Sequence, residues 1–315
     1  MKLLLTGANG FVGSWLIRTL LEEGHEIIGA SGPAAAPGVL TAAERERVTW
    51  VVLDLGDHQS VEACAGLSVD GVIHLAAVSS VSHSFTHPLE TWRVNLMGTV
   101  TLLEALAAER RNGRTDPQVL VVSTAEVYGP GGHELRVETD RINPVSPYAA
   151  SKAAVELAAL EIHRRTGLRL MIARPFPHTG PGQSARFVIP AFIERLRIAR
   201  RAGAPVVKTG NLEPVRDLLD VRDVAQAYLA LLVRGLPGEI YNVATGRGIS
   251  LEDVFYRIAD RLGHHAIPER DPALARGGDI PHLVGDPGRL RSATGWSPRF
   301  TLDQTLQHMI DAEAD

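Results

Sequence analysis

Three glycines, spaced three residues apart, follow the first apolar run of the chain. Gly7, Gly10 and Gly13 come directly after residues 2–5, and they open a stretch with helical apolar spacing that stops at Gly24. Between a buried strand and a helix, such glycines permit a tight turn, a close approach of the backbone to a pyrophosphate, and packing of the helix on the strand. The pattern predicts an α/β unit that binds a nucleotide cofactor at the start of its first helix.

Apolar strands and periodic helices alternate along the first half of the chain. The strands are predicted at residues 2–5, 26–30, 48–53, 71–75, 119–123 and 168–172, with helical patterns notably over 89–109 and 147–165. Near-continuous apolar runs are typical of strands buried on both faces of a parallel sheet. The alternation predicts an α/β fold, a doubly wound parallel sheet of the Rossmann type.

The pattern changes after Pro175, where glycine and proline become frequent. Two helical patterns and one strand follow, at residues 188–201, 221–233 and 239–243. We therefore expect a nucleotide-binding domain over residues 1–175 and a smaller substrate-binding lobe over residues 176–315, with a chain that can cross between them more than once.

Composition excludes several classes of function. The chain has 36 acidic and 32 basic residues and a net charge of −4, so no basic excess draws it to nucleic acid. Its longest apolar run, residues 224–233, is far shorter than the roughly 20 residues that span a bilayer. A single cysteine, Cys64, excludes an intramolecular disulfide framework. His83 and His87 are four residues apart but lack a third ligand in the sequence pattern, so we expect no bound metal. Because the apolar runs are short, we expect a cytoplasmic protein.

A tyrosine and a lysine share one face of a predicted helix. Tyr148 and Lys152 are four residues apart at the start of the pattern over 147–165. An ammonium group beside a phenol favours the phenolate, which brings a tyrosine with a free pKa near 10 into range as a general acid or base. The residues alone leave open an ordinary amphipathic helix, whose tyrosine packs and whose lysine is solvated.

A hydroxyl group lies at the end of a predicted strand. Thr124 follows the strand at 119–123, and ligands bind at this carboxyl edge of open α/β sheets. Its hydroxyl can hydrogen-bond the substrate oxygen that Tyr148 protonates, whereas the alternative is a local turn bond. Glu126, two residues later, is either a base or a structural carboxylate.

The glycine motif, Thr124, Tyr148 and Lys152 together resemble the extended short-chain dehydrogenase/reductase family, which includes nucleotide-sugar epimerases, dehydratases and ketoreductases. The resemblance covers essentially the whole chain and implies catalysis by these three residues with Glu126. The cofactor-binding residues that it implies are Gly7, Asn9, Gly10, Phe11, Val12, Gly13, Ser31, Asp54, Leu55, Leu75, Ala76, Ala77, Asn95, Tyr148, Lys152 and Pro175.

The end of the second predicted strand bears on the choice of cofactor. Ala30, Ser31 and Gly32 offer no acidic side chain to hydrogen-bond a ribose 2′-hydroxyl and repel a 2′-phosphate. No arginine stands at Gly32 to clamp such a phosphate either. We therefore favour NADP(H), with NAD(H) as the alternative.

Motifs in the second half resemble the substrate lobe of the family. The segment 210–217 resembles enzymes acting on GDP-mannose derivatives, and segments 176–183 and 280–298 resemble the branch that reduces the C4 ketone of GDP-4-keto-6-deoxy-D-mannose. Two arginines would then grip the diphosphate of a GDP-linked sugar, which suits a bidentate guanidinium. The implied substrate contacts are Ser79, Ser80, Thr124, Glu126, His178, Asn211, Arg216 and Arg276.

Three positions depart from the family pattern. Ala125 replaces the aspartate that dehydratases carry, which removes the usual acid for expelling a C6 hydroxyl. Pro177 replaces a substrate-contacting asparagine, and Val78 replaces a basic or polar residue. We expect a ketoreductase. The alternatives are an NAD-dependent 4-epimerase of the UDP-glucose or UDP-glucuronate type and a catalytically silent NAD(P)-binding scaffold.

The resemblance also implies a homodimer joined through four helices, two from each copy. The helical patterns over 89–109 and 147–165 carry apolar positions that can face both the sheet and a partner. These positions are Leu102, Leu103, Leu106, Val155, Leu157 and Leu160. The alternative is that they face only the sheet.

Overall fold

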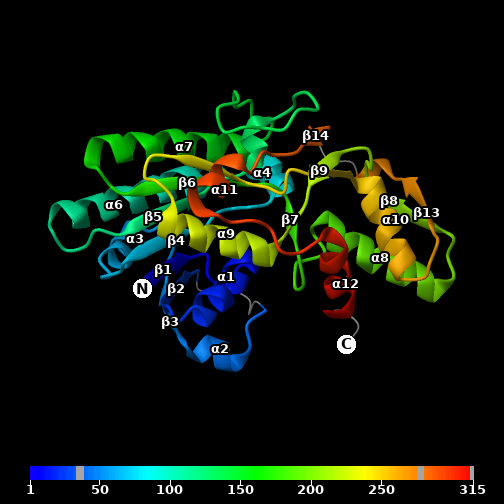
Figure 1. Cartoon of the computed structure of the whole chain (residues 1–315), viewed down its shortest axis with the longest axis horizontal. Helices are drawn as coiled ribbons and strands as arrows, with labels where there is room; N and C mark the ends of the chain where they lie inside the picture. Colours follow the sequence, from blue (N-terminus) through cyan, green and yellow to red (C-terminus); the bar gives the residue numbers. More distant parts are fainter. Residues whose placement is uncertain (33–38, 275–279, 313–315) are drawn as a thin grey trace.

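The computed structural model describes residues 1–32, 39–274 and 280–312 (Figure 1). Over these residues, seven parallel strands form one sheet in the order β11-β6-β5-β4-β1-β2-β3. The strands are β1 (Lys2–Thr6), β2 (Glu26–Ser31), β3 (Val48–Val52), β4 (Gly71–His74), β5 (Gln118–Val122), β6 (Leu170–Pro175) and β11 (Ile240–Val243). The strand order reverses between β1 and β4, where ligands bind in such sheets. The predicted Rossmann-type α/β fold is confirmed.

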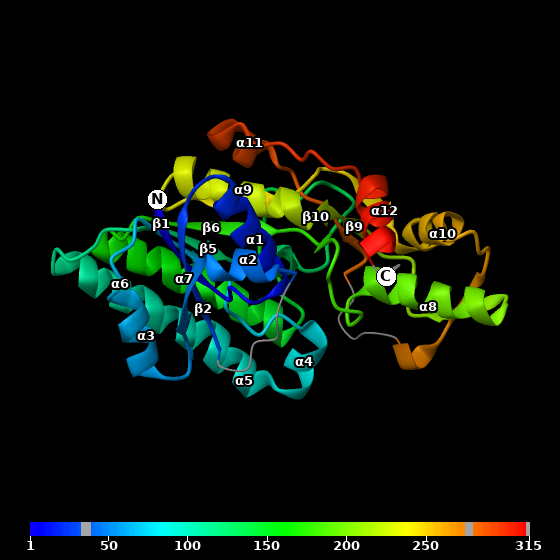
Figure 2. The same cartoon turned by 90° about the horizontal axis from the view of Figure 1, so that it is seen from below.

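Helices cover both faces of the sheet (Figure 2). One face carries α1 (Phe11–Glu22), α9 (Val221–Arg234) and α11 (Gly288–Thr294), and the other carries α3 (His58–Ala65), α6 (Thr99–Arg111) and α7 (Pro147–Thr166). Alternate strand residues serve the two cores: Leu3 and Leu5 pack on the α1 side, and Leu4 packs on the α6 side. All three leucines are fully buried, which explains the continuous apolar run at residues 2–5.

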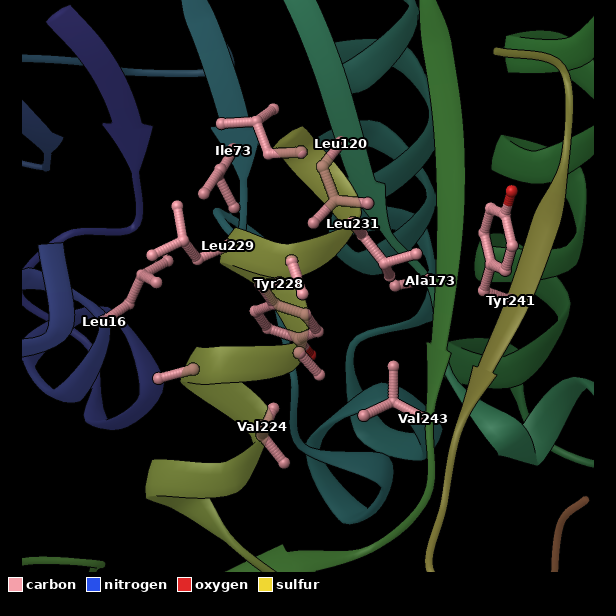
Figure 3. Close-up of a cluster of buried hydrophobic side chains, with 14 of the residues drawn as sticks. Leu16, Ile73, Leu120, Ala173, Val224, Tyr228, Leu229, Leu231, Tyr241 and Val243 are labelled. Carbon is pink, nitrogen blue, oxygen red and sulfur yellow. The ribbon is translucent and has the colours of Figure 1, made fainter. Parts of the chain in front are cut away.

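Helix α9 and strand β11 return to the sheet from beyond residue 175. Val224, Tyr228 and Leu231 of α9 lie against the strands that carry Ile73, Leu120 and Ala173, as Figure 3 shows. Strand β11 pairs in parallel with β6 and completes that edge of the sheet. The chain therefore crosses back to the first half of the fold, and the two-domain division at residue 175 stays a prediction.

The remaining elements form a smaller lobe with its own apolar core. It holds α8 (Val188–Ala202), α10 (Leu251–Arg261), α12 (Leu302–Ala312) and the parallel pair β8 (Val206–Thr209) and β13 (Ile267–Arg270). Short strands lie between this lobe and the sheet: β7 (His178–Thr179), β9 (Val215–Asp217), β10 (Leu219–Asp220), β12 (Gly248–Ser250) and β14 (His282–Leu283). The first half of the chain also has two short helices, α2 (Ala42–Glu46) and α4 (Val81–Thr86), and the lobe has a 3₁₀ turn at Pro272–Leu274. Among the described residues, no helix combines the length and apolarity needed to cross a membrane.

The helix predicted over 89–109 is interrupted. It begins as α5 (Pro88–Trp92), widens into a π-helical segment at Arg93–Gly98 and continues as α6. The wider turn faces Asn95 inward, where it is fully buried. A side chain at Gly98 would place its Cβ 2.6 Å from the Leu55 Cβ, so the turn is pressed against the segment after β3. Apolar periodicity does not distinguish a π turn from an α turn, so the sequence predicted one helix.

A substitution at Gly13 tests how closely α1 packs on the glycine loop. A Cβ there would lie 2.3 Å from the Gly7 oxygen, so Gly13→Ala should push α1 off the loop and lower the free energy of unfolding by at least about 2 kcal/mol. The matched control is Gly32→Ala, because a Cβ at Gly32 meets no atom within 4 Å; it should change stability by less than about 0.5 kcal/mol. Urea denaturation measures both, and equal stabilities of the two variants would contradict the prediction.

Candidate active site

The glycine loop is held between the ends of two neighbouring strands. Gly7 follows β1 with φ +70°, and a Cβ there would lie 2.9 Å from the Ala76 nitrogen. The Gly10 N–H donates to the Gly7 oxygen at 3.0 Å, and the Ala76 N–H donates to the Thr6 hydroxyl at 3.1 Å. Glycine is required at position 7 because both its dihedral and its clearance exclude a side chain. The loop thus leads into α1 at Phe11, with the helix N-terminus at the carboxyl edge of the sheet.

Asn9 and Ser31 join this loop to the end of β2. The Asn9 amide donates to the Ser31 hydroxyl at 2.8 Å, while the Asn9 Oδ1 is buried and has no hydrogen-bond partner among the described residues. A buried amide oxygen without a partner is costly, and a polar group of a bound ligand would satisfy it. Asp54 and Leu55 lie after β3, further along the same edge. The edge therefore suits a nicotinamide dinucleotide, with its pyrophosphate at the start of α1.

Thr124 and Tyr148 meet at the carboxyl end of β5. Thr124 caps the 3₁₀ turn at Ala125–Tyr128, and its side chain also hydrogen-bonds Tyr148. Burial raises the pKa of the Tyr148 phenol, the charge of Glu126 raises it further, and the Thr124 bond lowers it. Lys152 is not among the groups that shift this pKa, so the lowering expected from the lysine is not found, and burial keeps the phenol neutral at pH 7. A neutral phenol can give a proton to an oxygen that Thr124 also contacts.

Lys152 lies one helical turn after Tyr148 in α7. Its side chain is buried, and its Nζ donates to the Val122 carbonyl at 2.8 Å. Burial lowers the Lys152 pKa to about 8, and the nearby Glu156 carboxylate opposes that shift. The amine is therefore mostly charged at pH 7. His74, at the end of β4, is fully buried and stays neutral because burial and the Lys152 charge lower its pKa to about 3.

Asn95 holds two segments of the site together. Its Oδ1 accepts from the Val78 N–H at 2.8 Å, and its amide donates to the Val78 carbonyl and the Ser151 hydroxyl at 3.1 and 3.0 Å. Each polar atom of Asn95 thus has a partner within the protein, and together they fix the loop after β4 to α7. Its predicted contact with a cofactor stays a prediction, as does that of Pro175, buried at the end of β6.

The predicted substrate residues spread over several elements. Ser79 is exposed, and Ser80 caps α4 by accepting from the His83 N–H. His178 lies in β7, where burial lowers its pKa, and Asn211 accepts from the Glu213 N–H. Arg216 lies in β9, and Arg276 lies outside the described residues. The structure brings Thr124, Glu126 and Tyr148 together, and substrate contacts of the lobe residues stay predictions.

A family model described as GDP-mannose 4,6 dehydratase matches residues 4–309 of this chain. The chain belongs to this family. Its fold and its glycine, threonine, tyrosine and lysine motifs place it among the extended short-chain dehydrogenases/reductases, as expected from the sequence.

Individual members of the family carry out different reactions. GDP-6-deoxy-D-mannose reductase of Pseudomonas aeruginosa is 33% identical over 98% of this chain and 96% of its own length. The structure of RMD from Pseudomonas aeruginosa complexed with NADPH has a TM-score of 0.81 and 31% identity, covering 99% of this chain and 98% of that one. UDP-glucose 4-epimerase of Thermus thermophilus, in complex with NAD, has a TM-score of 0.84 and 32% identity, covering 99% and 98%. The similarity to NADPH-bound and NAD-bound structures supports a nicotinamide cofactor.

Two contacts that support helix α7 of this family member were not predicted from the sequence. The Ser84 hydroxyl accepts from the Tyr148 N–H at 3.2 Å and so supports the start of α7. Glu156, one turn after Lys152, forms a buried ion pair with Arg174 at 2.7 Å. The four-residue spacing from Lys152 to Glu156 was visible in the sequence. The partner on β6 was not, because it depends on the tertiary fold.

The two buried charges of α7 should affect stability in opposite ways. Folding lowers the Lys152 pKa from 10.5 to about 8, so at pH 7 the charged lysine disfavours the folded state. Lys152→Met should therefore keep or raise the free energy of unfolding while abolishing most turnover. Its advantage over the natural chain should shrink as the pH rises from 8 to 10, because the amine is then neutral in the folded state.

Glu156→Leu is the contrasting variant on the same helix. It leaves the Arg174 guanidinium buried without its carboxylate and should lower the free energy of unfolding by about 3–5 kcal/mol. Denaturation across this pH range measures both variants. A Lys152→Met protein as unstable as Glu156→Leu would refute this account of the lysine.

Proposed function

We propose that this protein is an NAD(P)H-dependent ketoreductase that reduces the C4 ketone of GDP-4-keto-6-deoxy-D-mannose. The observation that carries the proposal is the half-buried, neutral Tyr148 phenol, hydrogen-bonded to Thr124 at the carboxyl edge of the sheet. Ala125 stands where a dehydratase carries its acid, which disfavours dehydration. The similarity to GDP-6-deoxy-D-mannose reductase and to an NADPH-bound structure supports reduction of a GDP-linked sugar.

The protein's own groups then have distinct tasks in the reaction. A reduced nicotinamide cofactor, held by the glycine loop at the start of α1, would supply the hydride for C4. Thr124 orients the carbonyl oxygen by hydrogen bonding, and Tyr148 gives that oxygen the proton that completes the alcohol. The charged Lys152 ammonium, one turn away, stabilises the phenolate that remains. Arg216, and Arg276 outside the described residues, would bind the diphosphate.

A 4-epimerase is the second candidate, favoured by the similarity to the NAD-bound UDP-glucose 4-epimerase. The two reactions differ in cofactor balance, because a reductase consumes one reduced cofactor per turnover and an epimerase regenerates its own. The deciding experiment incubates the protein with each sugar nucleotide, with and without added NAD(P)H, and follows products by mass and NMR. We expect stoichiometric NAD(P)H oxidation with the GDP-keto sugar. Interconversion of UDP-glucose and UDP-galactose without added cofactor would overturn the proposal.

The role of Tyr148 is tested by Tyr148→Phe. Removing only the proton donor should lower turnover by about 10²–10⁴-fold and leave cofactor affinity within a few-fold. Tyr256→Phe is the matched control, because Tyr256 is 43% exposed on α10 and should leave turnover unchanged. Steady-state kinetics and cofactor titration measure both. Near-normal turnover in Tyr148→Phe would remove this tyrosine from the mechanism.

We propose NADP(H) as the cofactor, on the basis of the uncharged Ser31 hydroxyl beside Asn9 at the end of β2. Ser31→Asp should weaken NADPH binding and strengthen NADH binding, because a carboxylate there repels a 2′-phosphate and accepts from a 2′-hydroxyl. Ser31→Ala removes the hydroxyl without adding charge, so it should not strengthen NADH binding. Titration of both reduced cofactors decides this, and tighter NADH binding by the natural chain would contradict the proposal.

We also propose a homodimer, formed through α5, α6 and α7, in the cytoplasmic setting expected from the sequence. Four of the predicted interface positions, Leu102, Leu103, Leu106 and Val155, instead pack against the sheet. Exposed apolar side chains remain on these helices, with Leu89 84% and Leu157 65% exposed. Such side chains favour burial by a second copy.

The dimer prediction uses a matched pair of leucines. Leu157→Glu should give a monomer in sedimentation, because it places a charge within the proposed interface. Leu236→Glu, at a similarly exposed position beyond α9, should stay dimeric. A natural chain that sediments as a monomer at micromolar concentration would contradict the dimer.

A further inference from the structure

A second group of ligand-bearing side chains lies outside the active site, where α4 meets α5. His83 is in α4, His87 joins the two helices, and Glu90 is in α5. One ligand atom from each residue lies within 4.8 Å of the others. We propose that these three side chains bind a transition-metal dication of the Zn²⁺ or Ni²⁺ class. The sequence pattern showed only the two histidines, because Glu90 joins them through the break between the helices.

The spacing of the ligand atoms suits a single ion. The His83 Nε2 lies 3.1 Å from a Glu90 carboxylate oxygen, close to the roughly 3.3 Å that separates two ligands about 2.0 Å from a tetrahedral zinc. The rings of His83 and His87 are stacked, with centroids 4.3 Å apart and planes 8° apart. In stacked rings the nitrogen lone pairs lie in nearly parallel planes, so one of the two rings turns about its Cβ–Cγ bond when both bind a single ion, with the Glu90 carboxylate beside His83.

Thr86 orients the second histidine. Its hydroxyl donates to the His83 carbonyl at 3.0 Å and lies 2.8 Å from the His87 Nδ1. A threonine hydroxyl has one proton, so with that proton given to the carbonyl it accepts from an Nδ1–H. The Nε2 of His87 then carries the lone pair that a metal needs. Such an oriented imidazole is the usual arrangement around protein-bound zinc.

The donor set selects the class of ion. Two imidazoles and one carboxylate suit Zn²⁺, Ni²⁺ or Cu²⁺, whereas Mg²⁺ prefers a shell of oxygen atoms. The His83 and Glu90 side chains are 39% and 46% exposed, so an ion can enter from solvent and keep a water as a further ligand. Binding replaces the hydrogen bond between these two side chains.

An ion here would also affect the catalytic helix. Ser84, next to His83, accepts the Tyr148 N–H, so α4 supports the first turn of α7. An ion that fixes α4 to α5 should slow hydrogen–deuterium exchange over residues 81–92. This readout reports the site without any catalytic assay, so it does not depend on the proposed reaction.

The test titrates the full chain, without a polyhistidine tag, with ZnCl₂, NiCl₂ and MgCl₂ by calorimetry. We expect one Zn²⁺ or Ni²⁺ per chain and no comparable binding of Mg²⁺. His83→Ala and Glu90→Gln should each weaken binding by at least about tenfold. Both side chains lie at the surface, so both variants should fold, which circular dichroism verifies.

The matched control is His58→Ala. The exposed His58 ring lies 3.4 Å from Glu62 one turn later, and no third ligand joins this pair among the described residues. This variant should bind Zn²⁺ as the natural chain does. Unchanged Zn²⁺ affinity in His83→Ala, equal losses in His58→Ala, or exchange over residues 81–92 that ignores Zn²⁺ would each overturn the proposal.

Discussion

A guanidinium buried beside a parallel sheet needs a counter-charge and partners for its N–H groups, because leaving either unmet costs several kcal/mol. Arg174, at the end of β6, meets both needs with Glu156 on α7, whose carboxylate accepts from Nε at 3.0 Å and from Nη2 at 2.7 Å. The Tyr128 hydroxyl and the Glu138 carbonyl take further bonds. The pair therefore fixes the strand that ends at Pro175 to the helix that carries Tyr148 and Lys152.

The same pair also reaches Thr124 and the far edge of the sheet. The Ser123 hydroxyl, one residue before Thr124, donates to Glu156. The Tyr128 hydroxyl in turn donates to Asn242 of β11 at 2.7 Å. One buried network thus determines how Tyr148, Thr124 and the last strand lie relative to one another. Its effect on the candidate site is indirect, since these groups position Thr124 and Tyr148.

Local patterns predicted the fold well, whereas contacts between distant segments were not visible. The glycine motif and the strand run at residues 2–5 depend on neighbours in the chain, so spacing and apolarity suffice. The π turn that buries Asn95 and the support of Tyr148 by Ser84 depend on packing between separate elements. The raised Tyr148 pKa is likewise a consequence of burial, while the sequence showed only the nearby lysine.

Strand β11 has a consequence for how the chain folds during synthesis. It pairs with β6, yet about 65 residues separate the end of one strand from the start of the other. Until those residues leave the ribosome, the edge of β6 presents unpaired N–H and C=O groups, and the apolar face that α9 covers is exposed to water. A nascent chain that stalls before residue 240 therefore exposes an unpaired sheet edge and an apolar face. Chaperones bind such surfaces, and aggregation can begin from them.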